Sequence, residues 1–359
     1  MFRNQNIKEN YLDDSDVIFI DEEFEKKYVN KRLKANDLLV ARTGYPGTAC
    51  VVPEKYEGSQ TFTTLIARLK EGTNPFYACQ YINSDYGKKY FLATQIGGGQ
   101  KNSGAGILED FPMILPPTIE EQERIANFLK HFDNLITLHQ RKLDKLKIIK
   151  KSMLENCFPQ NGEKVPKFRF DGFSGDWEQR KLGDVIEQCL EKNTDMIYGI
   201  NDAIGVTLTK EMIPTYANMD ESTDVSNFYL VNPKCFVYNP RTHGKKIGLG
   251  LNTSNHTYIV TFNDTVFKIK DYQADENFLH IYLSREEWDK EACAISLGTS
   301  TIVLKWNVLC GMTFIAPSVE EQRKISELIV NLDNLITLHQ RKLEKLKVVK
   351  KSMLESMFV

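Results

Sequence analysis

The sequence predicts an α+β protein in which two variable domains are separated by two long antiparallel helices, coiled-coil-like and related by pseudo-two-fold symmetry. Three observations support this prediction. Residues 117–155 recur as 317–355 without a gap, and both copies place apolar residues at helical spacing. The stretches outside the repeat contain short β-branched or aromatic runs between turn residues, a pattern typical of strands.

The repeat has an offset of 200 residues, and 25 of its 39 aligned positions are identical. Asp133–Leu143 returns unchanged as Asp333–Leu343. A period of this length is too long for a solenoid, so the chain is a duplicated two-part unit. Each copy opens with Pro-Thr or Pro-Ser followed three residues later by Glu, which fits a capping box and predicts a helix start.

In the first copy, no Pro or Gly occurs between Asp133 and Pro159, so the helix can continue through this range. In both copies, Arg and Lys residues occupy the positions beside the apolar stripe. Two identical stripes in one chain indicate that the helices pair with each other. The alternative is two ordinary core helices, although this would not require near-identity of the exposed basic positions. The predicted helix-pair interface consists of Leu135, Leu138, Leu143, Leu146, Leu335, Leu338, Leu343 and Leu346.

The repeat divides the chain into five predicted regions. These are a first variable domain at 1–116, a helical region at 117–158, a linker at 159–176, a second variable domain at 177–316 and a C-terminal helical region at 317–359. Within the domains we expect strands at 37–42, 49–53, 234–239 and 258–262, and short helices near 75–92 and 275–292. The two variable domains show no likeness to each other comparable to that of the repeat.

The composition is that of an ordinary globular protein, with 359 residues, 42% hydrophobic residues, 26% charged residues and a net charge of −2. No apolar run reaches the roughly 18 residues of a membrane span, and the polar N-terminus predicts no secretory signal. The seven cysteines form no CxxC pair and lie at no metal-ligand spacing from a histidine. We therefore expect reduced thiols in a cytoplasmic protein, with no metal and no cofactor.

Three segments resemble enzyme signatures and fail on inspection. Asn74-Pro75-Phe76-Tyr77 resembles the Asn-Pro-Pro-Tyr motif of amino-methyltransferases, but Phe76 replaces the second Pro and no glycine-rich cofactor motif precedes it. Asn239-Pro240-Arg241 fails the same test, and the glycines of 97–106 lack the Gly-Lys-Ser/Thr of a phosphate loop. The sequence predicts a chain that is not itself catalytic.

The chain resembles the specificity (S) subunit of type I restriction-modification systems over essentially its whole length. The residues that carry the resemblance are the helix starts Pro117–Gln122 and Pro317–Gln322, the helices Leu135–Leu143 and Leu335–Leu343, and the segment Pro166–Phe173 followed by Trp177–Val185. The resemblance implies two target-recognition domains that bind double-stranded DNA. It also implies a complex with two DNA adenine methyltransferase subunits and, for restriction, two motor-nuclease subunits.

We therefore expect a DNA-recognition subunit that directs methylation and cleavage by its partners to a bipartite target. One departure matters: by the offset of 200, Met1 corresponds to Asn201, so the first domain is expected to be incomplete at its start, without a counterpart of roughly 164–200. This leaves an alternative open. The chain could be a truncated or shuffled specificity subunit that binds methyltransferase subunits as a scaffold without productive DNA reading.

Candidate DNA-binding residues follow from base and phosphate chemistry, because Arg reads guanine, Asn and Gln read adenine, and Lys mostly contacts phosphates. Two clusters follow predicted strands, and two lie in loops before the long helices that the resemblance places near DNA. The alternative for each is a solvated turn. The candidates are Arg42, Thr43, Tyr45, Gln100, Lys101, Asn102, Asn239, Arg241, Thr242, His243, Lys245, Lys246, Thr299, Ser300 and Thr301.

Overall fold

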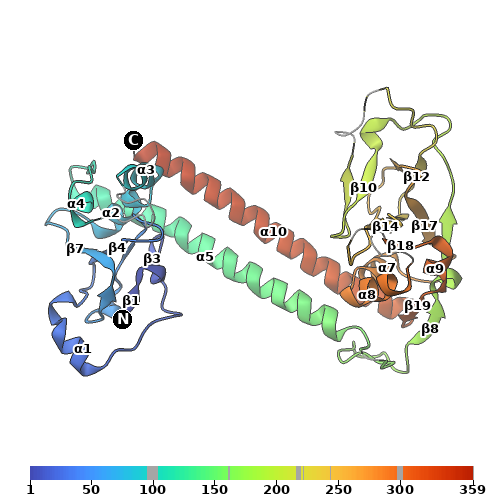
Figure 1. The fold of residues 1–359 in the computed structure, drawn as a ribbon, viewed down its shortest axis with the longest axis horizontal. Coiled ribbons are helices and arrows are strands. Elements are labelled where there is room, and N and C mark those ends of the chain that lie inside the picture. The colour runs from blue at the N-terminus through green and yellow to red at the C-terminus, as the bar shows by residue number, and fades with distance from the viewer. Residues whose placement is uncertain are drawn as a thin grey trace. The chain divides into compact units, whose positions relative to one another are not determined.

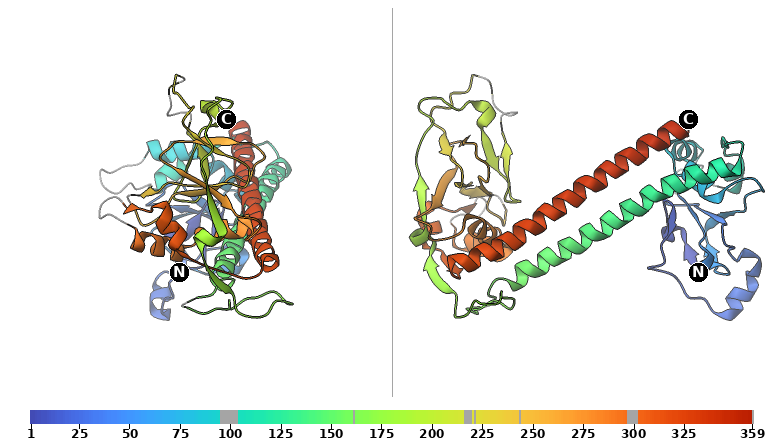
Figure 2. Two further views of the ribbon diagram at one scale, coloured as in Figure 1. Left: turned by 90° about the vertical axis from the view of Figure 1, so that its right-hand side faces the viewer. Right: turned by 180° about the vertical axis from the view of Figure 1, so that it is seen from behind.

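The computed structural model describes residues 1–94, 104–160, 162–215, 220, 222–242, 244–296 and 302–358. The chain divides into two compact units. Unit 1 comprises Met1–Asp144 and Thr337–Val359, and unit 2 comprises Lys145–Ile336. Each unit therefore contains one α+β domain and a part of both long helices (Figures 1 and 2). Within the described part of the chain, no helix combines the length and the hydrophobicity needed to cross a bilayer.

The two copies of the repeat form the helices α5 (Ile119–Asn156) and α10 (Val319–Met357). Their pairing is antiparallel, as predicted, because partner numbers rise along one helix as they fall along the other. Three contacts show this: His139 Nδ1 to His339 Nδ1 at 2.8 Å and Asp133 to Lys350 at 2.5 Å in unit 1, and Lys150 to Asp333 at 2.5 Å in unit 2.

The helix starts are those that the sequence predicts. Thr118 Oγ1 accepts the amide of Glu121 at 3.3 Å, and Ser318 Oγ accepts that of Glu321 at 3.4 Å. In the second copy the Glu321 side chain has a partner in the linker. Its buried carboxylate accepts two 2.9 Å hydrogen bonds from the Arg169 guanidinium. A bidentate charged pair is stronger than a single bond to a backbone amide, so the linker is fastened to the start of α10.

The seam between the helices follows positions spaced alternately three and four residues apart, as in a coiled coil. The half-buried or buried positions of this seam in α5 are Ile136, His139, Leu143, Leu146 and Lys150, and those in α10 are Ile336, His339, Leu343, Leu346 and Lys350. Leu143 and Leu343 are each 4% exposed. The seam thus contains polar positions that the apolar pattern did not indicate.

Three of the leucines predicted for this interface lie mostly outside the seam. Leu138 is 47% exposed, Leu338 is 45% exposed and Leu335 is 43% exposed. Neighbouring residues of a helix point about 100° apart. Because His139 and His339 occupy the seam, the leucine before each one points away from it. Leu135, Leu146 and Leu346 are half-buried.

The domain of unit 1 is built on a three-stranded antiparallel sheet in the order β5-β4-β7, with a short hairpin β2–β3 and a parallel pair β1–β6. The helix α2 packs on β5, and residues of α2 and α3 cover one face of the sheet. The elements are β1 (Phe2–Arg3), β2 (Ile7–Lys8), β3 (Tyr11–Leu12), α1 (Glu22–Lys27), β4 (Leu38–Ala41), β5 (Ala49–Val51), β6 (Thr61–Phe62), β7 (Thr64–Ala67), α2 (Pro75–Ile82), α3 (Asp85–Ala93) and α4 (Ala105–Glu109).

The domain of unit 2 has a four-stranded antiparallel sheet in the order β15-β13-β17-β9, and its core lies between this sheet and α7. Its first elements are β8 (Glu178–Lys181), α6 (Leu182–Val185), β9 (Ile186–Cys189), β10 (Ile204–Val206), β11 (Met212–Pro214), β12 (Tyr229–Val231), β13 (Phe236–Tyr238) and β14 (Arg241–Thr242). The later elements are β15 (Leu249–Leu251), β16 (Tyr258–Val260), β17 (Thr265–Ile269), α7 (Glu276–Leu283), α8 (Glu286–Ile295), β18 (Ile302–Val303), α9 (Trp306–Gly311) and β19 (Thr313–Ala316).

The two domains share one sheet register although their sequences differ. In unit 1, Leu38 pairs with Val51 on one side and Ala67 on the other. In unit 2, Phe236 pairs with Leu251 and Phe267 in the same way. The strands β5-β4-β7 therefore correspond to β15-β13-β17. Strands and helices occupy all the ranges predicted for them within these two domains.

Candidate nucleic-acid interface

The turn after β13 carries the candidate residues of unit 2. Asn239 Oδ1 accepts the amide of Arg241 at 2.9 Å, which closes the start of the turn. The strand β14 pairs antiparallel with β18, so Arg241 lies opposite Val303. The Leu304 amide also donates to the Pro240 carbonyl at 2.8 Å. The turn is thus held against the segment that follows the second predicted loop, whose candidates Thr299, Ser300 and Thr301 lie outside the described residues.

The side chains of this turn divide into exposed and buried groups. Arg241, Lys245 and Lys246 are exposed, whereas Thr242 is 5% exposed. Thr242 Oγ1 donates to the Lys246 carbonyl at 2.7 Å and accepts the Gly244 amide at 3.2 Å. The Thr242 hydroxyl is thus engaged within the turn and shapes it. The candidate His243 lies outside the described residues.

A buried ion pair fixes the end of the same turn. Asp289 Oδ1 accepts the Ile247 amide at 3.0 Å and the Lys210 ammonium at 2.6 Å. Lys210 also donates to the Ile247 carbonyl at 2.8 Å, and its Nζ lies 5.1 Å from the centre of the Trp288 ring. Burial lowers the pKa of Lys210, and the carboxylate of Asp289 opposes this shift. Sequence reasoning missed both residues, because no local pattern links positions this far apart.

His280 also contacts the backbone of Lys210. Its Nε2 donates to the Lys210 carbonyl at 3.2 Å, and its ring lies beside that of Phe236. Burial lowers the pKa of His280 from its ordinary value of 6.5 to about 4, and the neighbouring positive charges of Lys210 and Lys150 act in the same direction. The imidazole is therefore neutral in the folded domain at pH 7.

We expect the stability of unit 2 to fall as the pH drops from 6.5 to 4. In this window the unfolded chain takes up a proton on His280 that the folded chain does not, which costs up to about 3 kcal/mol. His280→Gln keeps a donor for the Lys210 carbonyl and removes the titrating group. Chemical denaturation of both proteins at pH 7, 5.5 and 4 measures the difference. Equal losses of stability in the two proteins would contradict this account.

The corresponding turn of unit 1 follows β4 and is held by Asn4, which sequence reasoning also missed. Asn4 Oδ1 accepts the Arg42 amide at 2.9 Å, and Asn4 Nδ2 donates to Thr43 Oγ1 at 2.6 Å. Arg42 is exposed at the start of the turn, and Tyr45 is 84% exposed. The other candidates of this unit, Gln100, Lys101 and Asn102, lie outside the described residues.

Gly47 ends this turn at a position that only glycine fits. Its φ is +87°, and a Cβ built on it would lie 2.6 Å from the ring of Phe91. Phe91 is fully buried in the core of unit 1. The turn is thus pressed against the core at one end and bound to Asn4 at the other, which gives Arg42 and Tyr45 a defined platform.

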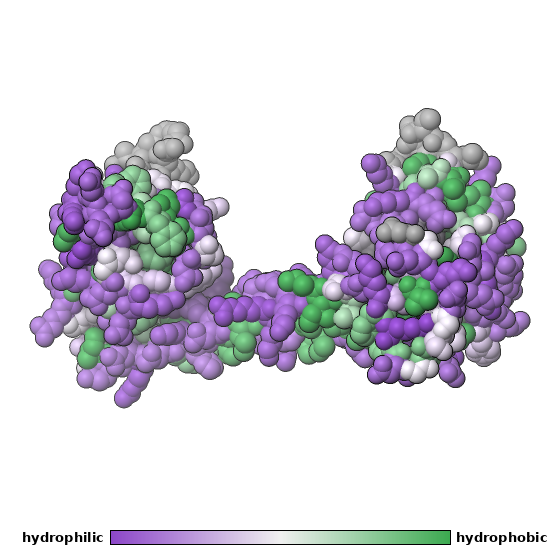
Figure 3. Space-filling model, turned by 90° about the horizontal axis from the view of Figure 1, so that it is seen from below, coloured by the Kyte–Doolittle hydropathy of each residue, from purple (hydrophilic) through white to green (hydrophobic). Residues whose placement is uncertain are grey.

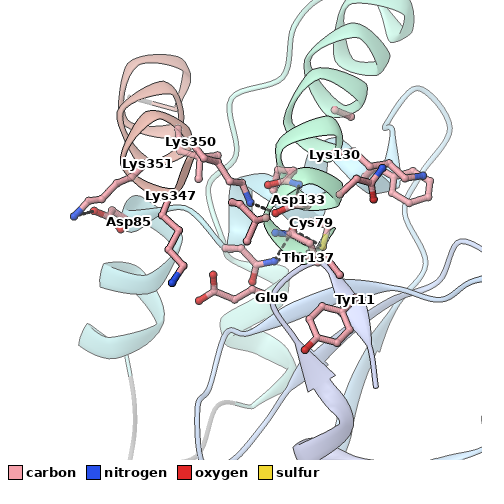
Figure 4. Close-up of a pocket in the computed structure, with 18 of the residues that line it drawn as sticks. Glu9, Tyr11, Cys79, Asp85, Lys130, Asp133, Thr137, Lys347, Lys350 and Lys351 are labelled. Atoms are coloured by element: carbon pink, nitrogen blue, oxygen red, sulfur yellow. Dashed lines mark hydrogen bonds and ion pairs between the residues drawn. The ribbon is translucent and has the colours of Figure 1, made fainter. Parts of the chain in front are cut away.

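Unit 1 also contains a cavity of about 450 Å³ between α2, α3, α5 and α10 (Figure 4). Three lysines that line it are paired with carboxylates: Lys350 with Asp133 at 2.5 Å, Lys351 with Asp85 at 3.3 Å and Lys88 with Glu9 at 2.7 Å. Nearby, Phe358 is buried between Tyr77 and Tyr81. This arrangement fastens the end of α10 to the first domain.

The described residues include no group of three or more His, Cys, Asp or Glu side chains that could hold a metal ion. Burial raises the pKa of the Cys50 thiol to about 12 and that of Cys157 to about 11, so neither is a thiolate near neutral pH. Figure 3 shows a face that is mostly hydrophilic, with apolar groups interspersed. The exposed turns with their Arg and Lys side chains therefore remain the strongest candidate site.

Comparison with known proteins shows which family the chain belongs to. The family model of the type I restriction modification DNA specificity domain matches residues 2–148 and 174–348. The type I restriction enzyme MjaVIII specificity subunit of Methanocaldococcus jannaschii is 26% identical over 285 residues, which span 74% of this chain and 66% of that protein.

One solved structure shares the fold of this chain. The crystal structure of the type I restriction-modification system S subunit from M. genitalium matches with a TM-score of 0.61 and 12% identity over 92% of this chain and 85% of that one. The HsdS subunit from Thermoanaerobacter tengcongensis matches with a TM-score of 0.46 and 14% identity over 99% and 89%. The two family matches together cover most of the chain, one on each side of the linker. The chain therefore belongs to the family of type I restriction modification DNA specificity domains and carries two copies of that domain.

Proposed function

We propose that this chain is the DNA-reading subunit of a type I restriction-modification complex, which directs adenine methylation and cleavage by partner subunits to a bipartite target. The observation that carries the proposal is the turn Asn239–Ile247. It presents the exposed Arg241 from a backbone held by β18 on one side and by buried Asp289 on the other. A fixed backbone is what bidentate recognition of a base requires, because a mobile arginine loses the geometry.

The two domains place different side chains on equivalent scaffolds. The sheets share their register, but the turn of unit 1 exposes Tyr45 after Arg42, whereas that of unit 2 exposes Lys245 and Lys246 after Arg241. Different side chains on the same platform would read different bases. We infer that the target consists of two dissimilar half-sites in double-stranded DNA, separated by base pairs that are not read.

Catalysis belongs to partner subunits in this proposal. The outer faces of α5 and α10 expose apolar residues at equivalent positions, Leu138 with Leu338 and Ile148 with Val348, at 45% to 69% exposure. Isolated exposed leucines are common, but a pattern duplicated at identical positions supports two equivalent contact surfaces. The duplication supports two copies of one partner, and we infer that these are two methyltransferase subunits, joined in the restriction complex by two motor-nuclease subunits.

A second candidate is a scaffold that binds methyltransferase subunits without productive DNA reading. It is favoured by one observation: among the described residues, β7 of unit 1 has a strand neighbour on one side only. Binding assays with methyltransferase subunits and DNA separate the two functions. Salt-dependent, sequence-specific binding by the assembled complex supports the reading function, and partner binding without sequence preference supports the scaffold.

Arg241→Ala in the assembled methyltransferase tests the reading role. A base contact should cost roughly 1–3 kcal/mol in DNA binding and relax one position of the methylated motif. A phosphate contact should instead weaken all sequences equally. Methylome sequencing and titration with target DNA measure both effects. Lys164→Ala, an exposed lysine in the linker, is the control. An unaltered methylome together with unaltered affinity would remove Arg241 from the interface.

A further inference from the structure

Among the described residues, one edge of the sheet in unit 1 has no neighbouring strand, whereas the equivalent edge in unit 2 pairs with β9. In unit 2, β17 pairs with β13 on one side and with β9 on the other. In unit 1, the equivalent strand β7 pairs with β4 alone among the described residues. The register shared by the two sheets makes Ile66 and Ala67 the counterparts of Val266 and Phe267.

The equivalent residues are less covered in unit 1 than in unit 2, as far as the described part of the chain shows. Val266 and Phe267 are 1% and 0% exposed, whereas every residue of β7 is only half-buried. The contrast is larger before the long helices. Phe314 in β19 is 2% exposed, but Ile114, which lies 200 residues earlier, is 66% exposed. The Met113–Pro116 segment has no strand partner within the described residues, whereas β19 pairs with β8.

A single continuous segment supplies both missing partners in unit 2. Its first strand, β8, pairs with β19, and its second strand, β9, pairs with β17. Between them α6 packs on α9. Its buried side chains are Trp177, Leu182, Val185 and Ile186, each at most 3% exposed. These residues form part of the main core of unit 2.

The backbone of β7 is oriented to receive such a strand. The Ala41 amide donates to the Thr48 carbonyl, so the backbone N–H and C=O groups of Ala41 point toward β5. In an antiparallel sheet these groups alternate in direction along a strand, so those of Leu38 and Val40 point toward β7. The backbone groups of their partners Ala67 and Leu65 therefore point toward β4. The amides of the alternate residues Ile66 and Arg68 point toward the unpaired edge. Unit 2 has the same parity, because the Lys270 amide donates to the Val185 carbonyl at 2.8 Å.

We propose that the edge of β7 and the Met113–Pro116 segment form one docking surface for a strand–helical turn–strand segment of a second polypeptide chain, of the kind that β8, α6 and β9 form in unit 2. Its apolar positions match those of Leu182, Val185 and Ile186. In unit 2 such a segment also pairs Glu187 with Lys268 at 3.1 Å, whereas Arg68 of unit 1 is already paired with Asp37 at 3.1 Å, so the apolar positions and the backbone carry the recognition. An open sheet edge beside exposed apolar side chains is the arrangement on which strand addition depends.

A peptide with the sequence of residues 174–192 of this chain is the probe. Added to the full-length protein, it should bind saturably with a 1:1 stoichiometry. Hydrogen exchange should slow by at least about tenfold at the amides of Ile66 and Arg68 and in Met113–Pro116, with exchange in β17 unchanged. The same residues fused ahead of Met1 should give the same protection. Absence of protection in both formats would overturn the proposal.

Two matched controls separate strand addition from nonspecific adhesion. A peptide N-methylated at Glu187 and Cys189 keeps every side chain but loses the amides that face β17 in unit 2, and it should bind at least about tenfold more weakly. Ile114→Asp and Val348→Asp alter residues that are each 66% exposed in unit 1. Only Ile114→Asp should abolish peptide binding. Equal binding of both peptides, or equal binding by both variants, would overturn the proposal. None of these readouts involves DNA, so they are independent of the proposed function.

Discussion

Leu343→Asp is expected to destabilise the helix pair of unit 1 by roughly 3–5 kcal/mol, and Leu143→Asp by a similar amount. Both leucines are 4% exposed in the seam. The substitution removes their apolar contacts and places a carboxylate where it is shielded from water. Equilibrium denaturation, followed by helical circular dichroism, measures the change in the free energy of unfolding.

Leu338→Asp is the matched control, because Leu338 lies on the same helix at 45% exposure. Outside the seam the carboxylate remains hydrated, so the expected change is within about 0.5 kcal/mol. The pair of variants therefore tests the position of the seam and not merely the tolerance of the helix. Equal destabilisation by Leu338→Asp and Leu343→Asp would show that the seam passes elsewhere.

Lys210→Met is expected to destabilise unit 2 by about 3–5 kcal/mol, because it leaves the buried Asp289 carboxylate without its cation. The side chains of this pair are 6% and 3% exposed, and the distance between Nζ and Oδ1 is 2.6 Å. Because Asp289 also holds the Ile247 amide, the same variant should weaken sequence-specific DNA binding by the assembled complex. Thermal denaturation and DNA titration measure the two effects.

Lys268→Met is the control for this prediction. Lys268 pairs with Glu187 at 3.1 Å, but the two side chains are 53% and 45% exposed. Exposed pairs contribute at most about 1 kcal/mol, so this variant should remain close to the parent protein. The double substitution Lys210→Met and Asp289→Leu should recover part of the lost stability, because no charge remains buried. A single variant as stable as the parent would mean that Lys210 does not compensate Asp289.

The sequence alone determined the elements whose signals are local. Apolar spacing, the capping residues Thr118 and Ser318 and the absence of Pro and Gly predicted α5 and α10, and duplication of the stripe predicted their antiparallel pairing. Short β-branched runs located β4 and β13 together with the turns that follow them. These features depend on neighbours within a few residues, which is the range that periodicity can report.

Only the tertiary structure decided which residues of those elements meet. It placed His139 and His339 in the seam at 2.8 Å and turned Leu138 outward, although leucine is the more apolar residue. It also joined Lys210 to Asp289, 79 positions apart. Such choices depend on the relative rotation of packed helices and on contacts that close long loops. Neither is encoded in a local pattern, so the platform beneath Arg241 becomes visible only in the folded domain.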